Sequence, residues 1–68
     1  MGNLTELGLR FKIKLLQEGK SQVWFAKRLG VSKQLITNIL YGEVNQRIEE
    51  AIKNYIETGE VNNVKDNN

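Results

Sequence analysis

Polar side chains recur at helical spacing in the segment 32–41. At about 100° per residue, five of them fall opposite Ile36 or flank that side: Lys33, Gln34, Thr37, Asn38 and Tyr41. Each can form hydrogen bonds and none is acidic. An amide can pair bidentately with adenine, an ammonium can reach guanine or a phosphate, and a threonine can offer its hydroxyl to a base or its methyl to thymine. This face is predicted to suit the major groove of a duplex.

The other side of the same segment is apolar. Leu35, Ile36, Ile39 and Leu40 fall within one arc of about 140°, so we expect this side to face a core. Ser32 precedes the segment as a helix N-cap, and the free N–H groups at such a start favour a phosphate oxygen.

Four helices are expected to position these side chains. Their predicted ranges are 4–18, 21–30, 32–41 and 45–58. Asn3 and Glu6 are expected to form a capping box at the first start, whereas Gly8 weakens the first turn and leaves a start after it as the alternative. The predicted ends lie at Gly19, at Gly30, before Gly42 and at Gly59. Residues 59–68 are polar and Asn-rich and are expected to be a flexible tail, which leaves 1–58 as the folded domain.

The second and third segments are joined by only Leu29-Gly30-Val31-Ser32. Helices this close in sequence must cross steeply, and Gly30 can supply the positive φ of the turn. Phe25 and Leu29 on one helix and Ile36 and Ile39 on the next have the spacing of a shared core. Residues 21–42 are therefore predicted to form a helix-turn-helix.

This segment resembles the Cro/repressor-type (XRE) helix-turn-helix family. The resemblance is carried by Ser21-Gln22, Phe25-Ala26, Leu29-Gly30-Val31-Ser32, Ile36, Ile39 and Gly42, and it extends from about residue 11 to about residue 56. It implies an all-α, compact lambda-repressor-like domain. The sequence pattern predicts four helices, where many relatives have five, and a five-helix domain is the alternative. The resemblance also implies sequence-specific binding of double-stranded DNA by a transcriptional regulator, a repressor of small phage or mobile-element type.

The resemblance assigns roles to individual residues. It implies base contacts by Lys33, Gln34, Thr37 and Asn38 of the recognition helix 32–41, and a DNA-backbone contact by Gln22. Position and side-chain chemistry add Ser32, Tyr41 and Arg47 as further backbone contacts. Relatives usually bind a near-palindromic operator as dimers. Because the apolar stripe of 45–58 is needed for the core, we expect a monomer or weak dimer that pairs on DNA.

Departures from the family pattern leave alternatives open. Leu35 and Leu40 occupy positions where relatives often have polar residues, which is consistent with a wider buried side on this helix. Val23 and Trp24 stand at positions that are usually polar, so they either pack against a neighbouring helix or contact a protein partner, as in an antirepressor. A DNA-architectural or recombination accessory factor with the same fold is the other alternative.

Charge is distributed unevenly along the 68 residues. The net charge is +2, but residues 1–47 hold eight basic and three acidic side chains (+5), and residues 48–68 hold two basic and five acidic ones (−3). A polyanion would therefore be attracted to the first two thirds of the chain.

Composition excludes much of enzyme chemistry. The absence of cysteine and histidine removes thiolate metal sites and the commonest general base, so no catalytic residue, metal or cofactor is expected. Glu49 and Glu50 are adjacent and would diverge by about 100° on a helix. The longest apolar run, Val23 to Ala26, is too short to span a membrane, and no signal peptide is evident, so a cytoplasmic protein associated with the nucleoid is expected.

Overall fold

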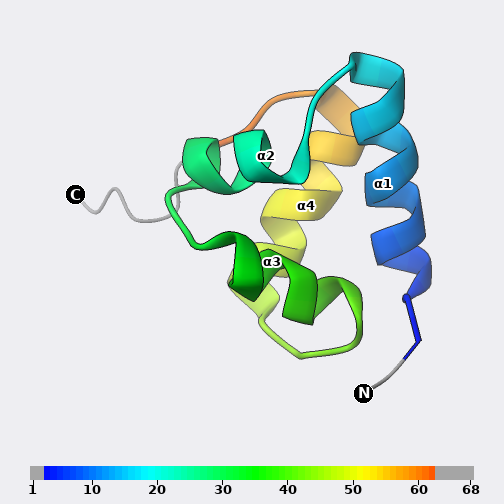
Figure 1. The fold of residues 1–68 in the computed structure, drawn as a ribbon, viewed down its shortest axis with the longest axis vertical. Helices are drawn as coiled ribbons and strands as arrows, with labels where there is room; N and C mark the ends of the chain where they lie inside the picture. The colour runs from blue at the N-terminus through cyan, green and yellow to red at the C-terminus, as the bar shows by residue number, and fades with distance from the viewer. Residues whose placement is uncertain (1–2, 63–68) are drawn as a thin grey trace.

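The computed structural model describes residues 3–62. This part of the chain forms four helices, α1 (Glu6–Glu18), α2 (Gln22–Leu29), α3 (Lys33–Leu40) and α4 (Gln46–Thr58). No β-strand occurs between residues 3 and 62, and the predicted all-α class is confirmed. Figure 1 shows α4 at the centre, with α1 along one side of it and α2 and α3 across it.

Short polar side chains begin the last three helices, as predicted. Ser21, Ser32 and Asn45 are the N-caps, and each side chain accepts a hydrogen bond from the backbone N–H three residues later. The predicted ends at Gly19, Gly30 and Gly59 are also confirmed. Local sequence signals therefore determine most of the helix boundaries.

The start of α1 differs from the prediction. The N-cap is Thr5, whose Oγ1 accepts a hydrogen bond from the Gly8 N–H at 3.0 Å. The Thr5 hydroxyl and backbone N–H both donate to the Leu40 carbonyl oxygen, at 3.0 and 2.9 Å. These contacts fix the helix start at Glu6. The Asn3 capping box and the start after Gly8 are therefore both wrong, because a contact with the end of α3 outweighs local spacing.

All four helices contribute to one apolar core. Its buried members are Phe11, Leu15, Phe25, Ala26, Leu29, Ile36, Ile39, Leu40, Ile48, Ile52 and Tyr55. The Phe11 ring lies 4.6 Å from the Phe25 ring and 5.9 Å from the Tyr55 ring, both edge-on. Such aromatic pairs contribute about 0.5–1.5 kcal/mol each beyond burial. Ile13 and Leu16, which flank the buried side of α1, are 46% and 81% exposed.

The chain continues past α4 against the body of the domain. Val61 packs partly buried against the core, and the Asn54 side chain donates to the Glu60 carbonyl at 3.4 Å. The first residues of the predicted tail, 59–62, therefore follow the folded surface, and residues 63–68 lie outside the described part of the chain. None of the four helices has the length and apolar character needed to cross a membrane.

Candidate nucleic-acid interface

A tight turn connects α2 to α3. Gly30 ends α2 with φ of 90°, a left-handed conformation that a β-carbon would disfavour. The N–H groups of Gly30 and Val31 both donate to the Ala26 carbonyl, at 2.9 and 3.0 Å. Val31 is partly buried against the core, as expected for the residue that fills the turn. The turn therefore directs α3 across the domain surface.

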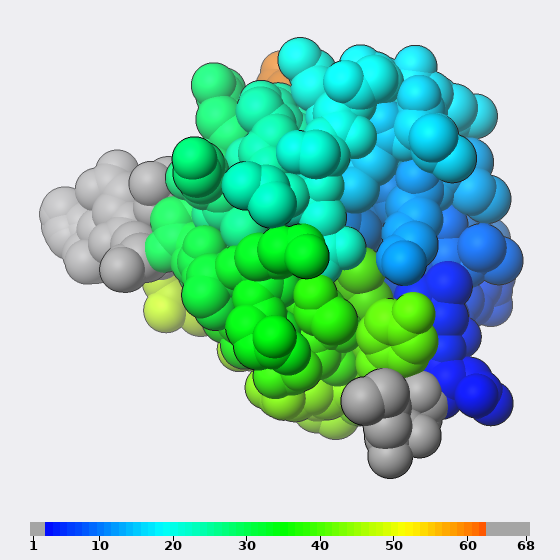
Figure 2. Space-filling view, in the orientation of Figure 1, coloured from blue at the N-terminus to red at the C-terminus, as the bar shows by residue number. Residues whose placement is uncertain are grey.

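Helix α3 has two chemically different sides. On the inner side Ile36, Ile39 and Leu40 are buried, and Leu35 is partly buried beside them. On the outer side Lys33, Gln34 and Asn38 are exposed, and Thr37 and Tyr41 are half-buried at the margins. In Figure 2 the green atoms of α3 form part of the face turned to the viewer, next to those of α2. The expected orientation of both sides is thus the one the structure has.

Two hydrogen bonds orient the outer side chains. Gln22 Nε2 on α2 donates to Thr37 Oγ1 at 2.6 Å, and Gln34 Nε2 donates to Asn38 Oδ1 at 2.9 Å. Because Thr37 Oγ1 accepts from Gln22, its hydroxyl hydrogen remains able to donate. Gln34 keeps its carbonyl oxygen and one N–H hydrogen, the acceptor and donor that adenine requires. The Gln22–Thr37 bond connects the start of α2 with the middle of α3, a contact that sequence spacing does not reveal.

The residues expected to contact the DNA backbone lie on three elements. Ser32 is exposed at the start of α3, where its hydroxyl oxygen accepts from the Leu35 N–H at 3.1 Å. Tyr41 caps the other end of α3, and Gln22 occupies the first position of α2. Arg47 is exposed in the first turn of α4. The structure thus brings Gln22 directly against α3, whereas Arg47 belongs to a separate helix.

A basic side chain that sequence analysis did not assign also lies at this surface. Lys12 of α1 places its Nζ 5.9 Å from the centre of the Tyr41 ring, within cation–π range. The signal that could have found it is Gly8, one helical turn earlier on the same side of α1. A β-carbon on Gly8 would lie 2.7 Å from the Leu40 carbonyl oxygen, so glycine is what allows α1 to approach α3 this closely.

Trp24 packs mainly within the domain. It is partly buried, and its ring lies 5.8 Å from the Tyr55 ring. Lys20 Nζ and the Arg28 guanidinium lie 5.0 and 5.9 Å from the Trp24 ring centre. These contacts agree with one of the two alternatives expected for Trp24, namely packing against a neighbouring helix. Val23 remains exposed on the outer side of α2.

Tyr55 carries the one buried side-chain polar atom without a hydrogen-bond partner among residues 3–62. Burial raises the pKa of its phenol above the ordinary value of 10.0, and the negative charge of Glu18 raises it further. The ring is surrounded by Phe11, Phe25 and Trp24, which offer no acceptor for its hydroxyl. Tyr55 is therefore a residue of the core and does not belong to the outer side of α3.

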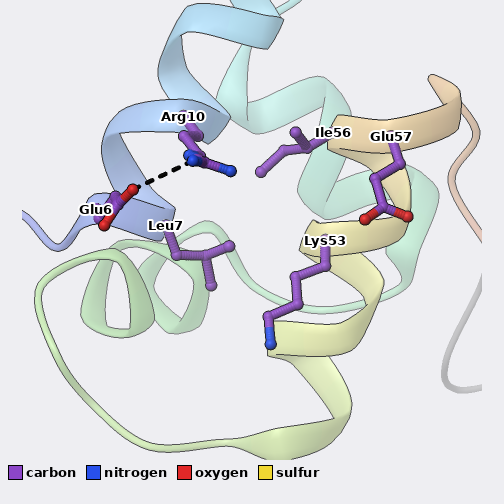
Figure 3. Close-up of a pocket in the computed structure, with 6 residues that line it drawn as sticks. All are labelled: Glu6, Leu7, Arg10, Lys53, Ile56 and Glu57. Carbon is purple, nitrogen blue, oxygen red and sulfur yellow. Dashed lines mark ion pairs between the residues drawn. The ribbon is translucent and has the colours of Figure 1, made fainter.

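A shallow groove of about 320 Å³ lies between α1 and α4. Figure 3 shows Leu7 and Ile56 within it and charged groups around them, including the Glu6–Arg10 ion pair at 3.2 Å. Its α1 residues lie on a different side of that helix from Lys12, given about 100° per residue. Within residues 3–62 no group of three or more acidic side chains could hold a metal ion.

Comparison with known proteins found no matching family model, no matching curated protein and no matching solved structure. Three features of the chain itself characterise this surface. They are the buried and exposed sides of α3, the hydrogen bond from α2 to α3, and the distribution of charge.

Proposed function

We propose that this chain binds double-stranded DNA sequence-specifically by placing the outer side of α3 in the major groove. One observation carries the proposal: Lys33, Gln34 and Asn38 are exposed and able to read base edges, with Gln34 and Asn38 opposite the buried Ile36 and Lys33 beside them. A helix of this width fits the major groove, which is about 12 Å wide. The resemblance to Cro/repressor-type regulators makes repression of transcription the proposed consequence of binding.

Each polar residue of the interface then has a defined task. Gln34 pairs with adenine, Asn38 and Thr37 contact neighbouring bases, and Lys33 reaches guanine or a phosphate. Ser32 and the open N–H groups at the start of α3 bind a phosphate oxygen, and the backbone contacts of Gln22, Tyr41 and Arg47 fix the register. The +5 charge of residues 1–47 attracts the duplex before these contacts form.

The proposed partner is an operator duplex, bound by a monomer or by a weak dimer that assembles on DNA. The apolar stripe of α4 is used by the core, where Ile48, Ile52 and Tyr55 are buried. A near-palindromic operator would bring two copies together with half-sites about 34 Å apart. Sedimentation at micromolar concentration is expected to show mostly monomer; a tight dimer would contradict this part of the proposal.

The test is selection of bound duplexes from a random library, followed by salt-titrated binding to the selected sequence. Gln34→Ala is expected to relax the preference at one base position, at a cost of about 1–3 kcal/mol for the selected base. Gln22→Ala is expected to weaken all duplexes similarly. Failure to enrich any sequence, together with affinity that does not change with salt, would refute the proposal.

The same experiment separates the two alternatives. A recombination accessory factor would bind the selected sequence equally well, but its footprint in the genome would lie at an attachment site and not at a promoter. A protein-binding module acting through Val23 and Trp24 would show no salt-sensitive DNA affinity. The packing of Trp24 against Tyr55 leaves Val23 as the more accessible part of that surface.

A further inference from the structure

We propose that Lys12 of α1, held over the ring of Tyr41, is a DNA-backbone contact at the C-terminal end of α3; this inference rests on the proposed function. Its Nζ lies 5.9 Å from the ring centre, and neither ion pair of the described residues involves it. An exposed ammonium without an acidic partner is free to neutralise a phosphate.

The position of Lys12 is fixed by the packing of α1 against α3. Thr5 donates two hydrogen bonds to the Leu40 carbonyl, and Gly8 lies against the same residue. In Figure 1 the C-terminal end of α3 lies beside the first turns of α1. Lys12 is one turn beyond Gly8 on the same side of α1, so the close approach carries it to Tyr41. Tyr41 is itself partly buried against the core, which makes its ring a fixed support.

The two ends of α3 would then both contact the DNA backbone. Ser32 and Tyr41 are nine residues apart, which is about 14 Å along a helix axis. This exceeds the width of the major groove, about 12 Å, so the two ends contact different phosphates. Lys12 and Tyr41 contact one phosphate at the exit of the helix, while Ser32 and Gln22 contact another at its entrance. Two separated anchors restrict how α3 can slide or tilt against the bases.

The experiment is salt-titrated binding of the selected duplex by the full chain, by Lys12→Ala and by Lys53→Ala. Lys53→Ala is the matched control, because this substitution removes the same positive charge from α4, at the groove between α1 and α4. One lost phosphate contact is expected to flatten the slope of log K against log salt by about 0.9 and to weaken binding about eightfold at 0.1 M salt. The selected sequence should not change, because a backbone contact carries no base information.

Further variants test the role of the aromatic ring. Lys12→Arg is expected to restore most of the affinity, since arginine keeps the charge and also binds aromatic faces. Tyr41→Leu retains an apolar side chain but removes the ring, so Lys12→Ala should weaken binding less in that background than in the natural chain. Thermal unfolding of Lys12→Ala should match that of the natural chain, because the side chain is exposed.

The outcomes separate this inference from the proposed function. If the natural chain binds DNA with a salt-dependent affinity but Lys12→Ala and Lys53→Ala weaken it equally, or neither does, the Lys12 contact is wrong and the α3 interface stands. If the natural chain shows no salt-dependent binding, both fail. A Lys12→Ala variant that changes the selected sequence would also overturn the inference, because it would indicate a base contact.

Discussion

Replacement of Gly8 by alanine tests the packing that joins α1 to α3. A β-carbon at this position would lie 2.7 Å from the Leu40 carbonyl oxygen, 2.8 Å from Leu4 Cδ1 and 3.1 Å from Leu40 Cβ. Non-bonded contacts of carbon are ordinarily about 3.5–4.0 Å, so α1 and the end of α3 would have to separate by several tenths of an ångström. The nearest atom belongs to the backbone and cannot rotate away.

Opposing effects set the size of the change. Alanine favours a helix over glycine by about 1 kcal/mol, which on its own would stabilise α1. Overpacking costs about 1–3 kcal/mol, and separation also weakens the two Thr5–Leu40 hydrogen bonds, each worth about 0.5–1.5 kcal/mol. We therefore expect Gly8→Ala to lower the free energy of unfolding by about 1–3 kcal/mol. A 68-residue domain has about 3–10 kcal/mol in total, so the loss is substantial.

The assay is urea denaturation together with thermal unfolding followed by circular dichroism. At about 4–8 °C per kcal/mol for a domain of this size, Tm should fall by roughly 5–20 °C. Gln17→Gly on the exposed side of α1 calibrates the helix-propensity effect without the packing contact. If Gly8→Ala unfolds at the same temperature as the natural chain or a higher one, helix propensity outweighs packing at this position and the expected strain is absent.

Two further predictions concern the core and the start of α3. Tyr55→Phe removes the buried hydroxyl that has no partner and should stabilise the domain by about 1 kcal/mol in urea denaturation; destabilisation would show that the hydroxyl makes a useful contact. The raised Tyr55 pKa means that the folded state favours the neutral phenol, so the contribution of Tyr55 to stability should be fully present below the ordinary pKa of 10.0 and be lost as pH rises above it. This alkaline loss should shrink in Tyr55→Phe, and identical pH profiles would contradict the assignment. Ser32→Ala removes the N-cap of α3 and should lower the free energy of unfolding by about 1 kcal/mol as well as weaken DNA binding. Ser32→Asp should restore the cap, but its negative charge should repel a phosphate. Equal DNA affinity for the two variants would argue against a phosphate at this helix start.

Local chemistry explains the parts of the fold that sequence analysis predicted correctly. Ser21, Ser32 and Asn45 precede apolar residues at helical spacing, and a short polar side chain before such a run satisfies backbone N–H groups wherever the helix packs. The division of α3 into buried and exposed sides was predictable for the same reason, since Ile36 and Ile39 differ sharply in hydrophobicity from Gln34 and Asn38. No knowledge of distant contacts was required at these positions.

The start of α1 and the close contact between α1 and α3 could not be predicted in this way. Asn3 and Glu6 have the spacing of a capping box, yet Thr5 is the cap because it also bonds to Leu40, which is 35 residues away. Gly8 was expected to weaken the first turn of the helix, but its lack of a side chain is what allows α1 to contact α3 closely. A sequence records residue types at each position but not which distant backbone atoms will lie beside them.

The sequence by itself determined four helices, the N-caps of the last three, a tight turn after Leu29 and a polar outer side on 33–41, because each depends on residues within a few positions of one another. Only the tertiary structure decided that Gln22 bonds to Thr37, that Trp24 lies against Tyr55 and that Lys12 lies over Tyr41. The physical reason is that these pairs meet only when separate helices pack, and the energy of close packing depends on the complete three-dimensional arrangement of the core.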